Sequence, residues 1–549
     1  MTETRKSILY WHYVIVGFGL LVGVALVAFF DPIQWINDAA QYESTARNLR
    51  DHGEFGTSCI FYGEHYGFGT VPAPQTVFPP GYPALIAGAS WLTGCSLRVA
   101  GFGVNLVCFV ASGWVLFSLC RRLGSRSDVA FFCSACWLLM ATMWHSTWLN
   151  LSESTFMFFA LLAIRLLLEP GWGFALVAGI LAAAGITMRY AGVFLVFAVG
   201  LNHAVIAFRS RDKKPLLHAV IFCIPPALAL AALFGRNLTL SGSARGGNDY
   251  PMTAPLQRVI LKFVASVARL FGINRHVLDD WVTATVSGVA VLALIAGTAW
   301  FLRERRRAAT SRQAAGQTAG SLLLLTFPLI YSVVLFLLEY FEGAGMTDRL
   351  MVPVVPFVLA AVSRFVSQAG TSSRVMLKAA VGLMMATTVA QFFAHQRLVS
   401  EASPSHALHD ALQSRLEPSH GNDQTLQAFL QANVTNQHPL LCNEPQLAHG
   451  LLKRPIIGLP TGRYNTGEEW SEDRVLKDVI EPYDVRFVLM AKDPSLLTER
   501  SPLFFQQIQA GEAGQSLRVL YETRLYTLFV IRRVNSIGTV QQTGTAGFR

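Results

Sequence analysis

The candidate functional residues of this chain are charged side chains that border apolar runs. Asp38 follows the first apolar run, at the start of a polar loop over 31–82; Glu153 begins a later run, and Arg189 separates two others. A charge in the hydrocarbon costs about 2.5 to 3.5 kcal/mol or more, so such residues face a cavity or the interface and commonly mark function. An acid at a membrane face beside a folded polar loop therefore indicates a site, not a simple connector.

The composition indicates that a membrane surrounds most of the chain. Of the 549 residues, 52% are hydrophobic and 14% are charged, and the mean hydropathy is +0.41. This apolar fraction is too high for a water-soluble globular protein. Apolar runs of roughly 17 to 25 residues predict about eleven transmembrane helices. These runs are 13–30, 99–120, 129–147, 152–168, 173–188, 190–208, 218–235, 282–302, 321–338, 350–366 and 376–393.

Basic residues gather in loops on one predicted side of the membrane. They include Arg121-Arg122, Lys213-Lys214, Arg305-Arg306-Arg307 and Arg374. The positive-inside rule then predicts a cytoplasmic N-terminus, an odd number of spans and an external C-terminus, as expected for a multi-pass protein of the cell (inner) membrane. The net charge of +10 is explained by these loops and the anionic lipid head groups beside them. No basic and aromatic groove pattern indicates nucleic-acid binding.

The chain divides by composition into two parts. Residues 1–395 are predicted to form a polytopic α-helical membrane domain with external loops at 31–82 and 236–281, the second containing a basic amphipathic helix typical of a membrane interface. Residues 396–549 are predicted to form a soluble, external (periplasmic) α/β domain, because helix-like segments alternate with strand-like ones. The strand-like segments are 439–442, 455–459, 485–490 and 517–534, the last with a hairpin break. This domain lacks a Gly-rich phosphate loop and metal-ligand spacing, which favours a stabilising or acceptor-recruiting role.

The order of motifs along the membrane domain resembles that of a known family. The motifs are NDAAQYESTARNLRDHGEF, TVFPPGYPALIAGASWLTG, NLSESTFMFFALLAI, GITMRYAGV, FGRNLTLSG and DRLMVPVVP. This order is similar to that of the GT-C class of integral membrane glycosyltransferases, in the bacterial branch related to protein O-mannosyltransferases and lipid A aminoarabinose transferases. The resemblance implies transfer of a sugar, generally with inversion, from a polyprenyl-phosphate-linked donor to a glycan, lipid or protein acceptor on the external face.

The resemblance also implies catalytic residues. Inverting transfer needs a carboxylate that orients or deprotonates the acceptor, and cationic or metal-linked groups that stabilise the departing phosphate. Asp38 matches the first-loop acid of the family. The family often has Asp-Glu at this point whereas this chain has Asp38-Ala39, so the second acid is sought at Glu43 or, preferably, Glu153. The alternatives are structural: Asp38 could cap the helix that follows it, and Glu153 could stabilise the start of its own helix.

Arginines are the physical choice for the lipid phosphate, because a guanidinium pairs with phosphate oxygens and stays charged. The predicted substrate-binding residues are Arg236, Arg349, Arg189, Tyr42, His65 and Pro80. The aminoarabinose branch has Lys before its Pro-Pro pair whereas this chain has Phe78, and His65 is the candidate replacement for that cation.

Two questions stay open at the level of the sequence. The chemistry allows a divalent metal ion, although no ligand cluster specifies one. The competing hypotheses for function are a non-catalytic membrane assembly subunit and a transporter with an external domain. A transporter is disfavoured because no internal repeat and no pair of broken apolar segments in corresponding halves is found.

Overall fold

The chain folds into two compact units. Unit 1 comprises Met1–Gln34 and Phe78–Ser400, and unit 2 comprises Trp35–Val77 and Glu401–Arg549. The structure, a computed structural model, describes residues 5–28, 37–61, 63–244, 255–270, 312–342 and 348–368, together with 422–434, 438–442, 448–449, 452, 454–458, 475, 479–491, 517–522 and 526–531. The polar loop predicted at 31–82 thus contributes most of its residues to the unit that holds the C-terminal region, whereas the sequence pattern grouped it with the membrane domain.

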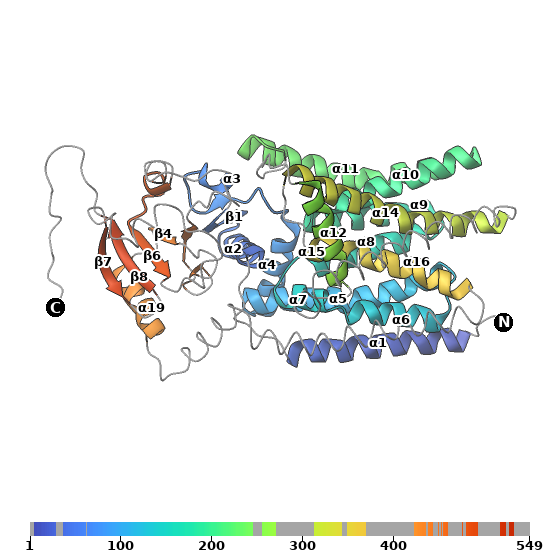
Figure 1. The fold of residues 1–549 in the computed structure, drawn as a ribbon, viewed down its shortest axis with the longest axis horizontal. Helices are drawn as coiled ribbons and strands as arrows, with labels where there is room; N and C mark the ends of the chain where they lie inside the picture. The colour runs from blue at the N-terminus through green and yellow to red at the C-terminus, as the bar shows by residue number, and fades with distance from the viewer. Residues whose placement is uncertain are drawn as a thin grey trace. The chain divides into compact units, whose positions relative to one another are not determined.

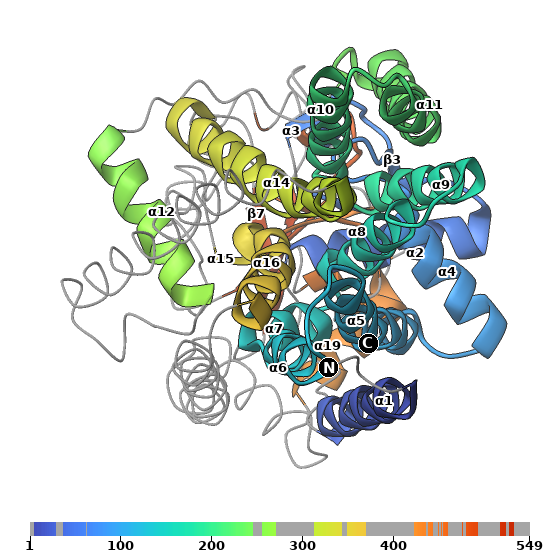
Figure 2. The ribbon, with the colours of Figure 1, turned by 90° about the vertical axis from the view of Figure 1, so that its right-hand side faces the viewer.

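Unit 1 is helical in the part of it that the structure describes (Figure 1). Its elements are α1 (Arg5–Ala28), α4 (Gly81–Thr93), α5 (Leu97–Arg122), α6 (Ser127–Leu138), α7 (Ala141–Trp148), α8 (Glu153–Leu167), α9 (Trp172–Met188), α10 (Gly192–Ser210), α11 (Lys214–Ser241), α12 (Leu256–Leu270), α14 (Arg312–Glu342), α15 (Asp348–Met351), the 3₁₀ helix η1 (Val352–Val354) and α16 (Val355–Gln368). Helix α5 packs against α1, α4, α6 and α8, α9 packs against α8 and α11, and α14 packs against α10 and α16. Figure 2 views these helices nearly end-on.

Four helices among the described residues are long and apolar enough to cross a membrane. They are Leu9–Val27 within α1, and α5, α10 and α11. The predicted span 129–147 is two helices, α6 and α7, which bend by 51° and make a fifth span if they cross together. Helix α9 and the segment Leu324–Leu338 of α14 are shorter apolar helices. The predicted spans 282–302 and 376–393 lie outside the described residues, so the total of about eleven stays a prediction.

Unit 2 is built on a six-stranded sheet with the order β2-β5-β4-β6-β8-β7. The strands are β2 (Cys59–Ile60), β4 (Leu440–Cys442), β5 (Ile456–Gly458), β6 (Phe487–Ala491), β7 (Leu517–Glu522) and β8 (Tyr526–Ile531); the unit also has α2 (Asn37–His52), α3 (Gly63–Tyr66), α19 (Asn422–Asn433) and the antiparallel pair β1 (Gly56–Thr57) and β3 (Ala73–Pro74). Strands β4 to β8 overlap the strand-like segments read from the sequence. The pairs among β2, β5, β4 and β6 are parallel, and β8 pairs antiparallel with β6 and β7.

The N-terminal polar loop supplies the edge strand β2 of this sheet. Cys59 and Ile60 stand opposite Ile456 and Ile457 of β5. Two tyrosines add side-chain links: Tyr66 donates a 2.6 Å hydrogen bond to the carbonyl of Gly458, and Tyr483 donates one of 2.6 Å to the carbonyl of His65. Buried donors and acceptors must be satisfied, so these bonds hold the loop in one register against residues nearly four hundred positions away.

Candidate functional site

The site in unit 1 is centred on Glu153, the first residue of α8. Its side chain is fully buried, and its Oε1 accepts hydrogen bonds from Nη1 of Arg189, at 2.6 Å, and from Nε of Arg349. Nη1 of Arg189 also lies 3.3 Å from the hydroxyl oxygen of Ser152. One carboxylate thus holds two guanidinium groups that come from the end of α9 and from α15.

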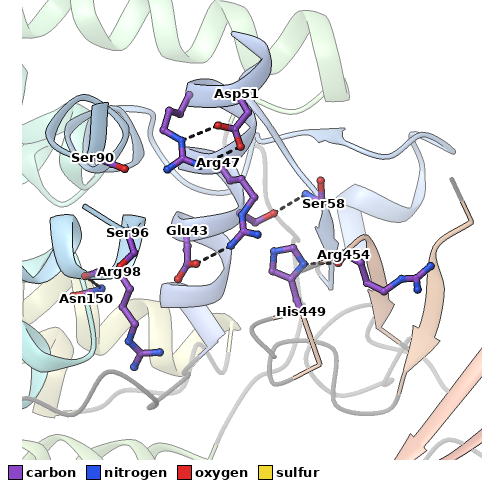
Figure 3. Close-up of polar contacts among 12 residues, drawn as sticks. Glu43, Arg47, Asp51, Ser58, Ser90, Ser96, Arg98, Asn150, His449 and Arg454 are labelled. Carbon is purple, nitrogen blue, oxygen red and sulfur yellow. Dashed lines mark hydrogen bonds and ion pairs between the residues drawn. The ribbon is translucent and has the colours of Figure 1, made fainter. Parts of the chain in front are cut away.

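Local backbone structure places each of these three side chains. The turn before α8 contains Asn150 in the left-handed region (φ 54°), and its side chain donates a 2.9 Å hydrogen bond to the carbonyl of Arg98 (Figure 3). Asn tolerates that conformation better than most residues. Arg189 is in an extended conformation (φ −151°, ψ 134°) at the point where α9 ends, which carries its side chain out of the apolar helix. Arg349 lies on the short helix α15.

The cluster brings two guanidinium groups to one carboxylate, and Tyr331 of α14 lies within electrostatic range of all three. The Arg349 side chain is 25% exposed and that of Arg189 is 13% exposed, whereas Glu153 has no exposed surface. A ligand can therefore reach the cations but not the carboxylate. Glu153 is placed to hold the arginines, and the arrangement suits an anion such as a phosphate.

Arg236 lies on α11 beside a second group of polar residues. Asn237 donates a 3.0 Å hydrogen bond to the hydroxyl of Tyr190, which follows Arg189 in the chain, and Nη1 of Arg236 lies 3.4 Å from Oδ1 of Asn237. The motifs NLSES, TMRY, FGRN and DRLM therefore meet in unit 1. Sequence reasoning missed Tyr190 and Asn237, although each stands directly beside an arginine that it did select.

Pro80 lies at the start of α4, next to the same region. It occupies the N-cap position with φ −76°, and Gly81 follows it as the first helical residue. A Cβ atom at position 81 would lie only 2.7 Å from the carbonyl oxygen of Thr187, and it would also overlap the Thr187 side chain. The Pro-Pro-Gly sequence therefore packs directly against the turn that carries Arg189, which only glycine permits.

The remaining predicted residues belong to unit 2. Asp38 is in the first turn of α2, inside the helix and not at its N-cap, where its carboxylate favours the positive helix end. Tyr42, one turn along, is 2% exposed. Glu43 is largely buried: its side chain is 13% exposed and accepts a 2.9 Å hydrogen bond from Arg47. The catalytic role of Asp38 stays a prediction.

His65 does not fit the predicted role of a replacement cation. It is fully buried, and its Nε2 lies 3.3 Å from Oε1 of Gln75, to which it donates. Burial lowers the pKa of His65 from 6.5 to about 4, so the ring is uncharged near neutral pH. The cations that the structure does bring to one site are the arginines of unit 1.

Buried histidines make unit 2 sensitive to acid. The pKa of His449 is also lowered by burial to about 4, so between pH 6.5 and pH 4 the unfolded chain binds more protons at His65 and His449 than the folded one. The contribution of these two neutral histidines to the free energy of unfolding is therefore fully present above pH 6.5, and it is lost as the pH falls toward 4.

We expect the unfolding temperature to drop over this window, and to drop less in His65→Gln than in the wild type. Thermal unfolding followed by circular dichroism at several pH values checks this, with the exposed His52→Gln as control; an equal acid sensitivity in His65→Gln would contradict it.

The described residues contain no group of three or more His, Cys, Asp or Glu side chains that could hold a metal ion. The acidic candidates Asp38 and Glu153 belong to different units.

Known structures share this architecture. ArnT from Cupriavidus metallidurans, in a crystal structure with bound undecaprenyl phosphate, aligns with 95% of this chain and 98% of its own at a TM-score of 0.54 and 14% identity. The Archaeoglobus fulgidus oligosaccharyltransferase tethered with an acceptor peptide aligns with 88% of this chain and 69% of its own, at a TM-score of 0.50 and 14% identity. No protein-family model and no curated protein sequence matches the chain. The structural similarity confirms the predicted resemblance: the chain has the fold of the GT-C glycosyltransferases.

Proposed function

We propose that the protein is a membrane glycosyltransferase that moves a sugar from a polyprenyl-phosphate-linked donor to a glycan, lipid or protein acceptor, with inversion at the sugar. The observation that carries this proposal is the pair Arg189 and Arg349, held by the buried carboxylate of Glu153 in a chain with the GT-C fold. The forked, permanently charged donors of two guanidinium groups match a phosphate group.

The proposed reaction assigns one task to the arginines and another to Asp38. The bond between the anomeric carbon and the phosphate oxygen breaks, and the phosphate leaves with additional negative charge. Arg189 and Arg349 stabilise that charge, and because Glu153 already fixes both guanidinium groups, little reorganisation is needed when the charge develops. The oxygen or nitrogen atom of the acceptor nucleophile forms a bond to the anomeric carbon, and the carboxylate of Asp38 accepts the proton that this atom loses.

Two further residues support the donor site in this proposal. Arg236 provides a third cation, next to Tyr190 and Asn237. Pro80 sets the start of α4 against the turn of Arg189. The ArnT structure was solved with undecaprenyl phosphate, which favours the same kind of donor here.

The topology belongs to the proposal as well. The basic loops favour a cytoplasmic N-terminus and a reaction on the external face of the inner membrane, among membrane lipids. The C-terminal residues of unit 2 are then periplasmic. The first polar loop, which joins their sheet through β2, is on the same side.

The experiment is transfer of label from a panel of radiolabelled polyprenyl-phosphate sugars to membrane fractions. We expect transfer by the wild type and none by Asp38→Asn. A hydrogen bond to a charged group contributes about 1.5 to 3 kcal/mol, so Arg349→Ala should lower kcat/KM roughly 10- to 150-fold. The control is Asp51→Asn, which removes an exposed carboxylate of the same helix as Asp38, paired with Arg50 at 2.7 Å.

The outcome also separates the competing functions. Full activity of Asp38→Asn at matched expression would contradict the proposed base. If the wild type consumes no donor of the panel, the transferase proposal fails, and the assembly-subunit hypothesis takes its place.

A further inference from the structure

Two buried nitrogen atoms of unit 2 have no hydrogen-bond partner among the described residues. They are Nε2 of His449 and Nε of Arg47. The His449 side chain is 2% exposed, and its Nδ1 lies 2.9 Å from the carbonyl oxygen of Arg454. A carbonyl can only accept, so Nδ1 carries the proton and Nε2 presents a lone pair. The cluster thus offers one acceptor and one donor, both buried.

The two nitrogen atoms belong to neighbouring side chains. Figure 3 shows the ring of His449 beside the guanidinium of Arg47, and the positive charge of Arg47 acts on the His449 ring. On the other side, Nη2 of Arg47 donates a 2.9 Å hydrogen bond to Glu43. The Arg47 and Glu43 side chains keep 23% and 13% of their surface exposed, so the cluster reaches the protein surface through these two residues of α2.

We propose that Glu43, Arg47 and His449 form a binding site for a polyhydroxylated ligand of the sugar class. A hydroxyl group donates one hydrogen bond and accepts others, so a single sugar hydroxyl can donate to Nε2 of His449 while it accepts from Nε of Arg47. A second hydroxyl on the adjacent carbon can donate to the Glu43 carboxylate. The statement that this sugar is the acceptor of the transfer reaction rests on the proposed function. The binding of sugar hydroxyl groups at the cluster does not depend on the proposed function.

The charges of the cluster disfavour an anionic ligand. Burial, and to a smaller extent the charge of Arg47, lower the pKa of His449 to about 4, so its ring is neutral near pH 7 and its lone pair faces the ligand. Glu43 adds a negative charge and already compensates Arg47. Monohydrogen phosphate has a single proton, which cannot serve both acceptors, and its negative charge would meet the Glu43 carboxylate. A neutral hydroxyl compound meets none of these penalties.

A single water molecule could satisfy the same two atoms, so the test must detect a sugar. The full-length protein is purified in a detergent without a sugar head group. Binding of methyl α-mannopyranoside and methyl β-glucopyranoside is measured by saturation-transfer difference NMR, with inorganic phosphate as competitor. We expect a signal with at least one glycoside that phosphate does not displace. Absence of a signal with both glycosides, or displacement by phosphate, overturns the proposal.

The variants locate the binding. His449→Phe keeps a ring but removes Nε2, and Arg47→Met keeps the length of the side chain but removes its donors; each should weaken glycoside binding at least about tenfold. His438→Phe is the matched control, because His438 lies in the same unit with 19% of its side chain exposed and contacts Asp484. Circular dichroism checks the fold, and if His449→Phe does not fold, Arg47→Met decides, because the Arg47 side chain is partly exposed. Unchanged binding in a folded variant overturns the site.

This measurement needs neither donor nor transfer, so its failure can be told from a failure of the proposed function. Asp38→Asn should abolish transfer and keep glycoside binding. If the wild type binds the glycoside at this cluster but transfers no sugar, the sugar-binding site is supported and the transferase proposal is contradicted.

Discussion

Glu153→Ala is expected to lower the free energy of unfolding by about 3 to 5 kcal/mol, which is the usual result when one partner of a buried ion pair is removed. The change leaves Arg189 and Arg349 without the carboxylate oxygen that both now contact. We expect a value toward the lower end, because the Arg349 side chain is 25% exposed and keeps some water contact. Denaturant unfolding in detergent micelles measures the loss.

Glu169→Ala is the matched control for this prediction. Glu169 also contacts two arginines of unit 1, Arg165 at 2.5 Å and Arg122 at 3.0 Å, but its side chain is 23% exposed. Because water screens such pairs, we expect its loss to cost at most about 1 kcal/mol. Equal losses in the two variants would show that burial of Glu153 contributes nothing beyond an ordinary surface pair. Glu153→Gln keeps the shape of the side chain and is expected to fold, with transfer reduced because the arginines are less firmly held.

Gly81→Ala is expected to lose most transfer activity and to cost about 1 to 3 kcal/mol of stability, as in other overpacked sites. The new methyl group would lie 2.7 Å from the carbonyl oxygen of Thr187, and a backbone atom cannot move aside as a flexible side chain can. The turn from Thr187 to Arg189 must shift, and with it the guanidinium that contacts Glu153. The kinetic measurement is kcat/KM for the donor.

Gly88→Ala on the same helix is the control, since a Cβ atom there has no atom within 4 Å. Alanine is a better helix former than glycine by about 1 kcal/mol, so this variant should be as stable as the wild type or slightly more stable. If Gly81→Ala behaves in the same way, the packing of α4 against the Arg189 turn does not position the site.

The sequence by itself determined the properties that depend on composition and on short periodic patterns. The apolar runs predicted a mostly helical chain, and the motif order predicted its GT-C fold, which the structural comparison confirms. Short apolar segments bounded by turn residues marked strands β4, β5, β6 and β8, because parallel and central strands read as continuous apolar runs. The charge of Arg189 between two apolar helices was reason enough to expect a function or a polar partner at that place.

The tertiary structure alone decided which of these residues meet. Glu153 contacts arginines 36 and 196 positions away, and no local pattern reports the partner of a charged residue at such a distance. For the same reason the edge strand β2, only two residues long, was not predicted. Nor was the buried His449 nitrogen that has no hydrogen-bond partner among the described residues. Helical and strand periodicity record which face of an element is buried, whereas the packing of helices and the pairing of strands select the partner. That selection brought Glu153 together with two arginines, Arg189 and Arg349.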